Sequence, residues 1–374
     1  MARCYQNGVG VAKNAENAVV WYKKAAEQGN AEAQCALGEC YYQAFGVEKN
    51  EKEARGWYEA AATQGNATAQ YMIGRLYAEL SYNEAAVKWY TKAAEQECPE
   101  AQYELGDCYS YGIGVAKDLE QAFEWYKKAA EQGNATAQCS LGYCYENGIG
   151  VEKDVIKATE WYQKSAEQGN CRAQCNLGYC YANGKSVEKN SAKAVEWYRK
   201  AAENGNATAQ KNLGGCYEYG RGVALSKAAA AEWYRKAADQ GDVDAQYKLG
   251  LFYENGYGVA QNKEEAVKWY RKSAEQGYAD AQYNLAELLL WKDGEEAFKW
   301  YQKAAKQGHA GAQNGLGFCY EEPDKEMEMM EIDIYPSVGV EKDSAKAVEW
   351  YRKAAEQGLD SAQYHLGRCY EGGK

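Results

Sequence analysis

The stretch AVEWYRKAAENGNATAQKNLGGCYEYGRGV, residues 194–223, decides the fold because close copies of it recur along the whole chain of 374 residues. The pair Trp-Tyr marks each copy, usually at intervals of 36 residues, with two shorter intervals of 32 and 31 residues and a longer one of 50. A fixed period of this length is typical of arrays in which each repeat packs against its neighbours. We therefore expect one elongated domain over residues 1–374, with partial repeats at both ends. The pairs begin at Trp21, Trp57, Trp89, Trp125, Trp161, Trp197, Trp233, Trp269, Trp300 and Trp350.

One helix of the repeat is predicted around the Trp-Tyr pair, and we call it the second helix. Ala54, Trp57 and Tyr58 are spaced i, i+3 and i+4, which places them on one face of an α-helix. We expect Trp57 and its equivalents to belong to the core. Asn50 precedes this helix as a predicted N-cap, and Gly65 follows it as a residue suited to a left-handed C-terminal cap.

The segment that follows predicts another helix, which we call the first helix of the next repeat. Its pattern, NATAQ followed by LG and CY, places Leu37 and Cys40 on an apolar side. A glycine-rich connection such as ENGIGVEKD, residues 146–154, joins first and second helices into a hairpin. One hairpin cannot bury its own apolar face, whereas stacked hairpins can. We expect an all-α, right-handed superhelical solenoid of about ten helix-turn-helix repeats.

The repeated motif A.AQ..LG..Y..G.GV..D..KA..WY.KAAEQG resembles the Sel-one-like repeat, a relative of the tetratricopeptide repeat. The resemblance covers essentially the whole chain and implies a scaffold for protein–protein interaction. Cysteine-rich bacterial members of that family carry disulfides between the end of a second helix and the start of the next first helix. The matching positions here are Ala26 with Gln34 and Ala130 with Gln138, so we expect no such disulfide ladder.

The thirteen cysteines are interpreted as reduced thiols that fill small apolar spaces. Seven of them share one phase of the repeat, and the total is odd. The alternative is a metal-binding thiol cluster at Cys171, Cys175 and Cys180, but no Cys-x-x-Cys spacing supports it. We expect no metal and no cofactor.

Charge and hydropathy exclude several classes of partner. The net charge is -11 and no stripe of Lys or Arg is present, so nucleic acid is not an expected partner. No apolar run reaches the length of a membrane-spanning helix, and the first ten residues lack the pattern of a signal peptide. We expect a cytoplasmic location. The alternative is the endoplasmic reticulum or the secretory pathway, if the chain is a segment of a longer protein that carries a signal upstream.

Asn-Ala-Thr occurs at Asn66, Asn134 and Asn206, and each could accept a glycan. We interpret these asparagines as helix caps instead. Two histidines and the glycine-rich connections form no recognised catalytic or phosphate-binding motif, so we predict that the chain is not an enzyme.

Positions that vary among otherwise constant repeats are candidates for recognition. Two such positions lie three residues apart on the first helix, on one side of it and away from its leucine. Asparagine can bind a peptide backbone through its amide, and tyrosine supplies contact area with little loss of rotamer entropy. The predicted partner-binding residues are Ser140, Tyr143, Asn176, Tyr179, Asn212 and Lys248.

These observations leave two functions open. The first is an adaptor whose concave face binds a peptide or helix of a partner protein, and the second is a structural spacer within a larger complex, or next to further domains of the same polypeptide. An acidic insertion rich in methionine, at about residues 321–337, is predicted to be a surface loop, with a docking arm as the alternative.

Overall fold

The computed structural model describes residues 1–321 and 338–371, and within them every regular element is an α-helix, as predicted. The first helices are α1 (Ala2–Asn7), α3 (Ala31–Gln43), α5 (Ala67–Glu79), α7 (Pro99–Tyr111), α9 (Ala135–Asn147), α11 (Cys171–Asn183), α13 (Ala207–Tyr219), α15 (Val243–Asn255), α17 (Ala279–Leu289), α19 (Ala310–Glu321) and α21 (Asp360–Glu371). The second helices are α2 (Ala15–Glu27), α4 (Glu51–Thr63), α6 (Asn83–Glu95), α8 (Leu119–Glu131), α10 (Val155–Glu167), α12 (Ser191–Glu203), α14 (Lys227–Asp239), α16 (Lys263–Glu275), α18 (Gly294–Lys306) and α20 (Ser344–Glu356).

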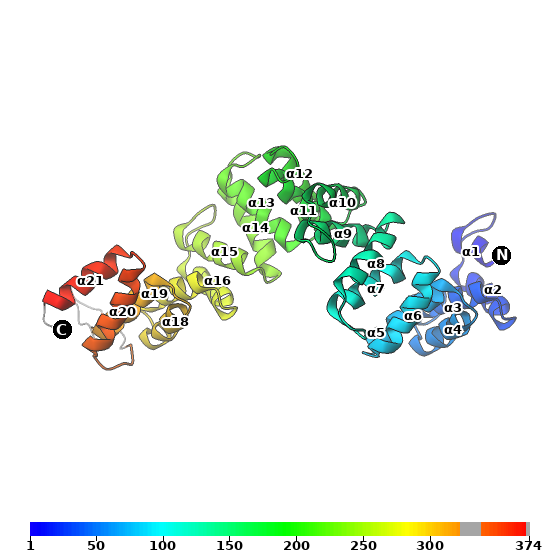
Figure 1. Ribbon diagram of the computed structural model, residues 1–374, viewed down its shortest axis with the longest axis horizontal. Coiled ribbons are helices and arrows are strands. Elements are labelled where there is room, and N and C mark those ends of the chain that lie inside the picture. The colour runs from blue at the N-terminus through cyan, green and yellow to red at the C-terminus, as the bar shows by residue number, and fades with distance from the viewer. Residues whose placement is uncertain (322–337, 372–374) are drawn as a thin grey trace. The chain divides into compact units, whose positions relative to one another are not determined.

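The helices form two compact units, Met1–Lys189 and Asn190–Lys374. In each unit, consecutive first and second helices lie side by side as hairpins, and each second helix also packs on the next first helix (Figure 1). No helix in the described part of the chain is long and apolar enough to cross a membrane. Of the insertion predicted at about residues 321–337, residues 322–337 lie outside the described residues, and Glu321 is the last residue of α19.

Side-chain caps set where the helices begin. The Oδ1 of Asn50 accepts a hydrogen bond from the backbone N of Glu53 at 3.1 Å. The Oδ1 of Asn66 likewise accepts from the third residue of α5, as Asn134 and Asn206 do in their helices, so the interpretation of these asparagines as caps is confirmed. At the other end, Gly65 has φ 90°, the left-handed conformation predicted for it.

The core is shared between consecutive repeats. One buried cluster joins Ala54, Tyr58 and Ala61 of α4 to Ala69 and Ile73 of α5, and the same arrangement recurs in both units. Neither hairpin contains a complete core alone. Stacking therefore supplies the burial that the sequence predicted it would.

The expectation that tryptophan belongs to the core is wrong for most repeats. The fully buried aromatic residue is the tyrosine that follows it, such as Tyr58, whereas Trp57 is half-buried against the cluster of α2 and α3. Only Trp269 and Trp300 are buried, and Trp21 is 39% exposed. The indole lies at the rim of the interface between hairpins, where a lysine three residues later covers its outer face: the Nζ of Lys164 is 4.0 Å from the ring centroid of Trp161.

A glycine of the first helix makes room for the buried tyrosine. The ring of Tyr162 lies directly on the backbone at Gly142, where an added Cβ would stand 2.7 Å from two of its carbon atoms. Gly38, Gly74, Gly106, Gly214, Gly250 and Gly317 meet their own tyrosines in the same way. The repeated Leu-Gly pair is therefore a packing requirement of the tyrosine.

Buried glutamines connect three successive helices. The Nε2 of Gln138 on α9 donates to the backbone carbonyl of Ala130 at 3.1 Å, and its Oε1 accepts from the Nε2 of Gln168 at 2.8 Å. Gln34 makes the equivalent bond to the carbonyl of Ala26. In cysteine-rich relatives the resemblance places disulfides at these same pairs of positions. In this chain a hydrogen bond from glutamine to a backbone carbonyl joins the two helix ends instead.

The cysteines lie mostly inside the helix stacks. All thirteen are free thiols; Cys40 and Cys144 are buried within apolar clusters, and Cys180 is buried beside the Thr159 hydroxyl. In the described residues, Cys171, Cys175 and Cys180 belong to no group of three or more His, Cys, Asp or Glu side chains that could hold a metal ion. Burial raises the pKa of Cys144 to about 11, as expected for a thiol that serves as apolar filler.

Candidate protein-interaction surface

Four of the predicted partner-binding residues lie on two first helices of the first unit. Ser140 and Tyr143 belong to α9, and Asn176 and Tyr179 belong to α11. Tyr143 and Tyr179 are 43% and 44% exposed, while Ser140 and Asn176 are half-buried beside them. Large aromatic side chains that remain in water at positions the repeat does not fix are candidates for contact with a partner.

Cationic side chains link these two helices. The guanidinium carbon of Arg172 on α11 is 5.6 Å from the ring centroid of Tyr143 on α9. The Nζ of Lys185 lies 4.7 Å from the ring centroid of Tyr179 and 3.4 Å from a carboxylate oxygen of Glu146. The structure therefore brings the four predicted residues of the first unit onto one surface of alternating aromatic and charged groups, which we call the tyrosine surface.

The other two predicted residues lie in the second unit and have different surroundings. Asn212 is half-buried on α13. The Nζ of Lys248 on α15 donates to the Tyr219 hydroxyl at 3.1 Å and to the carboxylate of Glu218 at 3.4 Å. Glu218 is itself buried and accepts the Tyr234 hydroxyl at 2.6 Å. Burial alone would raise the pKa of Glu218, but the Tyr234 hydroxyl and the Lys248 ammonium outweigh it, so this pKa is lowered. Lys248 thus stabilises a buried carboxylate.

Sequence reasoning missed a structural role at one of the two variable positions. Where that position is acidic, its carboxylate accepts the hydroxyl of the buried tyrosine, as Glu39 does from Tyr58 at 2.6 Å. In several repeats where it is not acidic, as at Tyr143, a glutamate three residues later takes that role, and Glu146 accepts from Tyr162 at 2.8 Å. Two repeats carry no acid at either position: Arg75 is followed by Ala78, and Tyr179 by Ala182. The first arrangement also holds for Asp107 and Glu287, and the second for Glu218, Glu254 and Glu321. Comparing the repeats at both positions together would have revealed this alternation.

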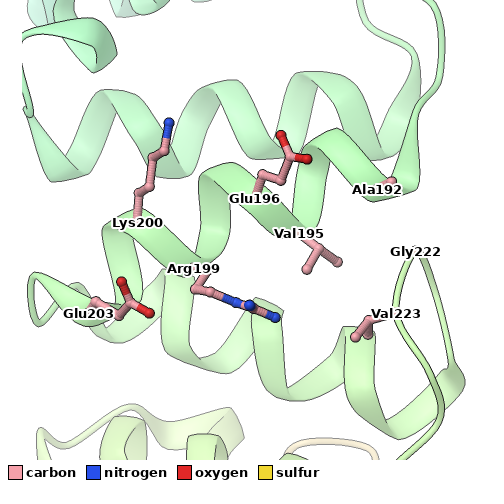
Figure 2. A pocket seen from close by; sticks show the side chains of 8 residues that line it. All are labelled: Ala192, Val195, Glu196, Arg199, Lys200, Glu203, Gly222 and Val223. Carbon is pink, nitrogen blue, oxygen red and sulfur yellow. The ribbon is translucent and has the colours of Figure 1, made fainter.

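A shallow hollow of about 380 Å³ lies on the second-helix side of the second unit (Figure 2). It is lined by residues of α12, among them Val195, Arg199 and Glu203, and by Gly222 and Val223 of the next connection. Arg199 donates to the Tyr217 hydroxyl at 2.9 Å. The sequence of α12 recurs unchanged in α20, so the hollow is built from residues of the common framework.

A model of the Sel1 repeat matches the sequence almost without interruption. The chain belongs to the Sel1-repeat family. Most of the eleven matched segments cover one hairpin each, whereas α19 (Ala310–Glu321) lies between two of them. The matched segments are residues 1–30, 31–66, 67–98, 99–134, 135–170, 171–206, 207–242, 243–278, 279–309, 335–359 and 360–374.

Solved structures similar to this chain include two Sel1-repeat proteins. One is described as c5321, a protective antigen present in uropathogenic Escherichia coli strains that displays an SLR fold; it is 38% identical, with a TM-score of 0.81, over 100% of this chain and 79% of that one. The other is a Sel1 repeat protein from Oxalobacter formigenes, 34% identical with a TM-score of 0.58, over 63% of this chain and 98% of that one. No curated protein matches the chain.

Proposed function

We propose that this Sel1-repeat protein is a non-enzymatic adaptor that binds an extended segment or a helix of a partner protein at the tyrosine surface. The observation that carries the proposal is the pair Tyr143 and Tyr179, exposed on neighbouring first helices at positions that the repeat leaves free. Asn212 and Lys248 remain candidate contacts of the second unit.

The chemistry of the tyrosine surface suits a peptide. Tyr143 and Tyr179 offer flat apolar area together with a polar hydroxyl, which is the composition of many binding hot spots. The Asn176 amide offers both a donor and an acceptor to a peptide backbone. Arg172 adds positive charge beside the Tyr143 ring, whereas the charge of Lys185 beside Tyr179 is offset by Glu146. Charge at this surface therefore favours neither an acidic nor a basic partner.

The proposed function does not by itself determine where in the cell the protein acts. A cytoplasmic adaptor stays our prediction. The endoplasmic reticulum or the secretory pathway stays the alternative prediction.

Affinity capture from the native cell lysate, followed by mass spectrometry, tests the proposal. We would compare the unmodified chain with the Tyr143→Ala, Asn176→Ala, Tyr179→Ala variant and with Tyr82→Ala, which removes an exposed tyrosine outside any first helix. A partner lost by the triple variant alone would support the tyrosine surface. A partner retained by all three proteins would refute it, and the capture of no protein at all would favour the spacer.

A further inference from the structure

One exposed tyrosine of the second unit is surrounded by cations. Tyr219 is the last residue of α13, and its side chain is 51% exposed. The guanidinium carbon of Arg221 is 4.8 Å from the centroid of its ring, and the Nζ atoms of Lys227 and Lys248 are 5.6 Å and 5.5 Å from the same centroid. The Lys248 ammonium also donates to the Tyr219 hydroxyl at 3.1 Å. We call Tyr219 and these three cations the cationic patch.

Three variable positions of the repeat supply the cations. Arg221 lies in the connection after α13, Lys227 is the first residue of α14, and Lys248 belongs to α15. A tyrosine also ends α7, at Tyr111, but the cationic positions are filled differently around it. The residues at the equivalent positions there are Ile113, Leu119 and Ser140. The helix-turn-helix framework therefore does not require the cations of the patch.

A second exposed tyrosine borders the cationic patch. The connection 256–262 lies against the first turn of α14, since an added Cβ at Gly258 would stand 2.2 Å from the backbone carbon of Lys227. The Lys227 Nζ accordingly lies 5.5 Å from the ring centroid of Tyr257, whose side chain is 47% exposed. Exposed tyrosines from two consecutive hairpins thus accompany the cations, and tyrosine is frequent among the residues that dominate binding energies.

The charges of the cationic patch do not balance. A carboxylate oxygen of Glu218 is 3.4 Å from the Lys248 Nζ, and its other oxygen is 3.7 Å from the Lys227 Nζ, so two ammonium groups share one acid. Arg221 is exposed and makes no ion pair with any residue that the structure describes. The patch therefore holds three cations against one carboxylate, and counting Glu254, the next acid along α15, still leaves it positive. This excess lies in a chain whose net charge is -11.

We propose that the cationic patch binds an acidic segment of a partner protein. Asp or Glu side chains of that segment pair with Arg221 and Lys227, and an apolar side chain beside them packs on the rings of Tyr219 and Tyr257. The excess of positive charge determines the choice, because a basic segment would be repelled there. The patch gives the candidate contact Lys248 a partner of defined chemistry. It shares no residue with the tyrosine surface of the first unit, so either site can fail without the other.

The first step of the test is an array of nonapeptides probed with the full chain. Each peptide has one central Trp, Phe, Tyr, Leu or Met flanked by Asp and Glu, and its matched controls have Asn and Gln, or Lys, in place of the acids. Peptides that bind are then measured by fluorescence anisotropy. We expect acidic peptides to bind and their controls not to bind. The absence of binding by every acidic peptide, or equal binding by the neutral controls, would overturn the proposal.

A charge variant then locates the binding. Arg221→Gln combined with Lys227→Gln removes two cations and leaves Lys248 beside the buried carboxylate, so the protein should keep its melting temperature. We expect this variant to bind the acidic peptides more weakly by about tenfold or more. The control, Lys52→Gln combined with Lys88→Gln, removes the same charge from exposed side chains of the first unit and should leave the affinity unchanged. Equal affinities of the two double variants would refute the site.

A tyrosine variant tests the aromatic part of the patch. Tyr219→Asn should fold normally, because other first helices end in asparagine at this position, as α15 does at Asn255. It should weaken binding by about fivefold or more, whereas Tyr111→Asn, the same change at the end of α7, should not. Equal affinities of these two variants would contradict the proposed contact. Binding that appears only after residues 324–336 are deleted would assign the patch to the acidic insertion of this chain and would overturn a foreign partner.

Discussion

Removing one hydroxyl, in Tyr162→Phe, tests the idea that a carboxylate of the first helix stabilises each hairpin through its buried tyrosine. The Tyr162 ring is fully buried, and its hydroxyl donates to the Oε2 of Glu146 at 2.8 Å. Hydrogen bonds to charged groups contribute about 1.5–3 kcal/mol. Glu146 also contacts Lys185 at 3.4 Å and is only half-buried, so it keeps part of its stabilisation without the hydroxyl. We therefore expect the free energy of unfolding to fall by about 2 kcal/mol.

Urea denaturation followed by circular dichroism measures this loss. With a urea dependence of about 1–3 kcal/mol per M, the midpoint of the transition should fall by roughly 1 M. Tyr90→Phe is the control in the same unit, because Arg75 and Ala78 occupy the two acid positions of its hairpin and the Tyr90 hydroxyl has no hydrogen-bond partner among the described residues. It should change stability by a few tenths of a kcal/mol, roughly. Equal losses in both variants would refute the reasoning.

Three further changes probe the packing and the hydrogen bonds of the repeat. Gly142→Ala should lower the free energy of unfolding by about 1–3 kcal/mol, because the added Cβ would clash with the Tyr162 ring. Its control, Gly56→Ala, lies within a helix and has nothing within 4 Å of the added Cβ, so it should raise the free energy of unfolding by roughly 0.5–1 kcal/mol; urea denaturation measures both. Gln138→Ala should cost about 2 kcal/mol in the same assay, since the Ala130 carbonyl loses its donor. The melting temperature should fall as pH rises from about 8.5 towards 11, because burial raises the pKa of Cys144 to about 11 and stabilises only its protonated form.

Each of these expectations has a contrary result. A stabilised Gly142→Ala variant would mean that the ring shifts without cost. A Gln138→Ala variant as stable as the unmodified chain would show that water replaces the amide. A flat melting temperature across the alkaline range, or rapid reaction of the Cys144 thiol with a thiol reagent at pH 8, would contradict the burial of that side chain.

The fold could be predicted from the sequence because the start, the end and the buried face of a helix are each marked by residues within a single repeat. Asn50 marks the start of a helix, Gly65 marks its end, and the spacing of Ala54 and Tyr58 defines the face that packs. Helical spacing alone cannot distinguish the centre of an interface from its rim. For this reason Trp57 was expected in the core beside Tyr58, although the indole lies at the edge.

The surfaces were harder to predict than the fold. Tyr143 and Tyr179 are exposed on neighbouring helices, as expected from variable positions. Lys248 varies as they do, yet it pairs with a buried carboxylate that only the three-dimensional contacts reveal. A hollow of about 950 Å³ beside Trp291 lies at the short connection 290–293, and the shorter interval in the sequence gave no measure of this space.

The alternation of the acid between two positions gives the array a way to diversify. Where a glutamate such as Glu146 at the later position accepts the tyrosine hydroxyl, the residue three positions earlier is not needed for that hydrogen bond. That earlier residue is Tyr143 here, and it is Gly215, Leu251 or Phe318 in other repeats. A duplicated repeat can thus acquire a second acid, lose the original one and keep its hydroxyl bond at every intermediate step. The repeats with Arg75 and Tyr179, which carry no acid at either position, show that the earlier position can also vary without this arrangement.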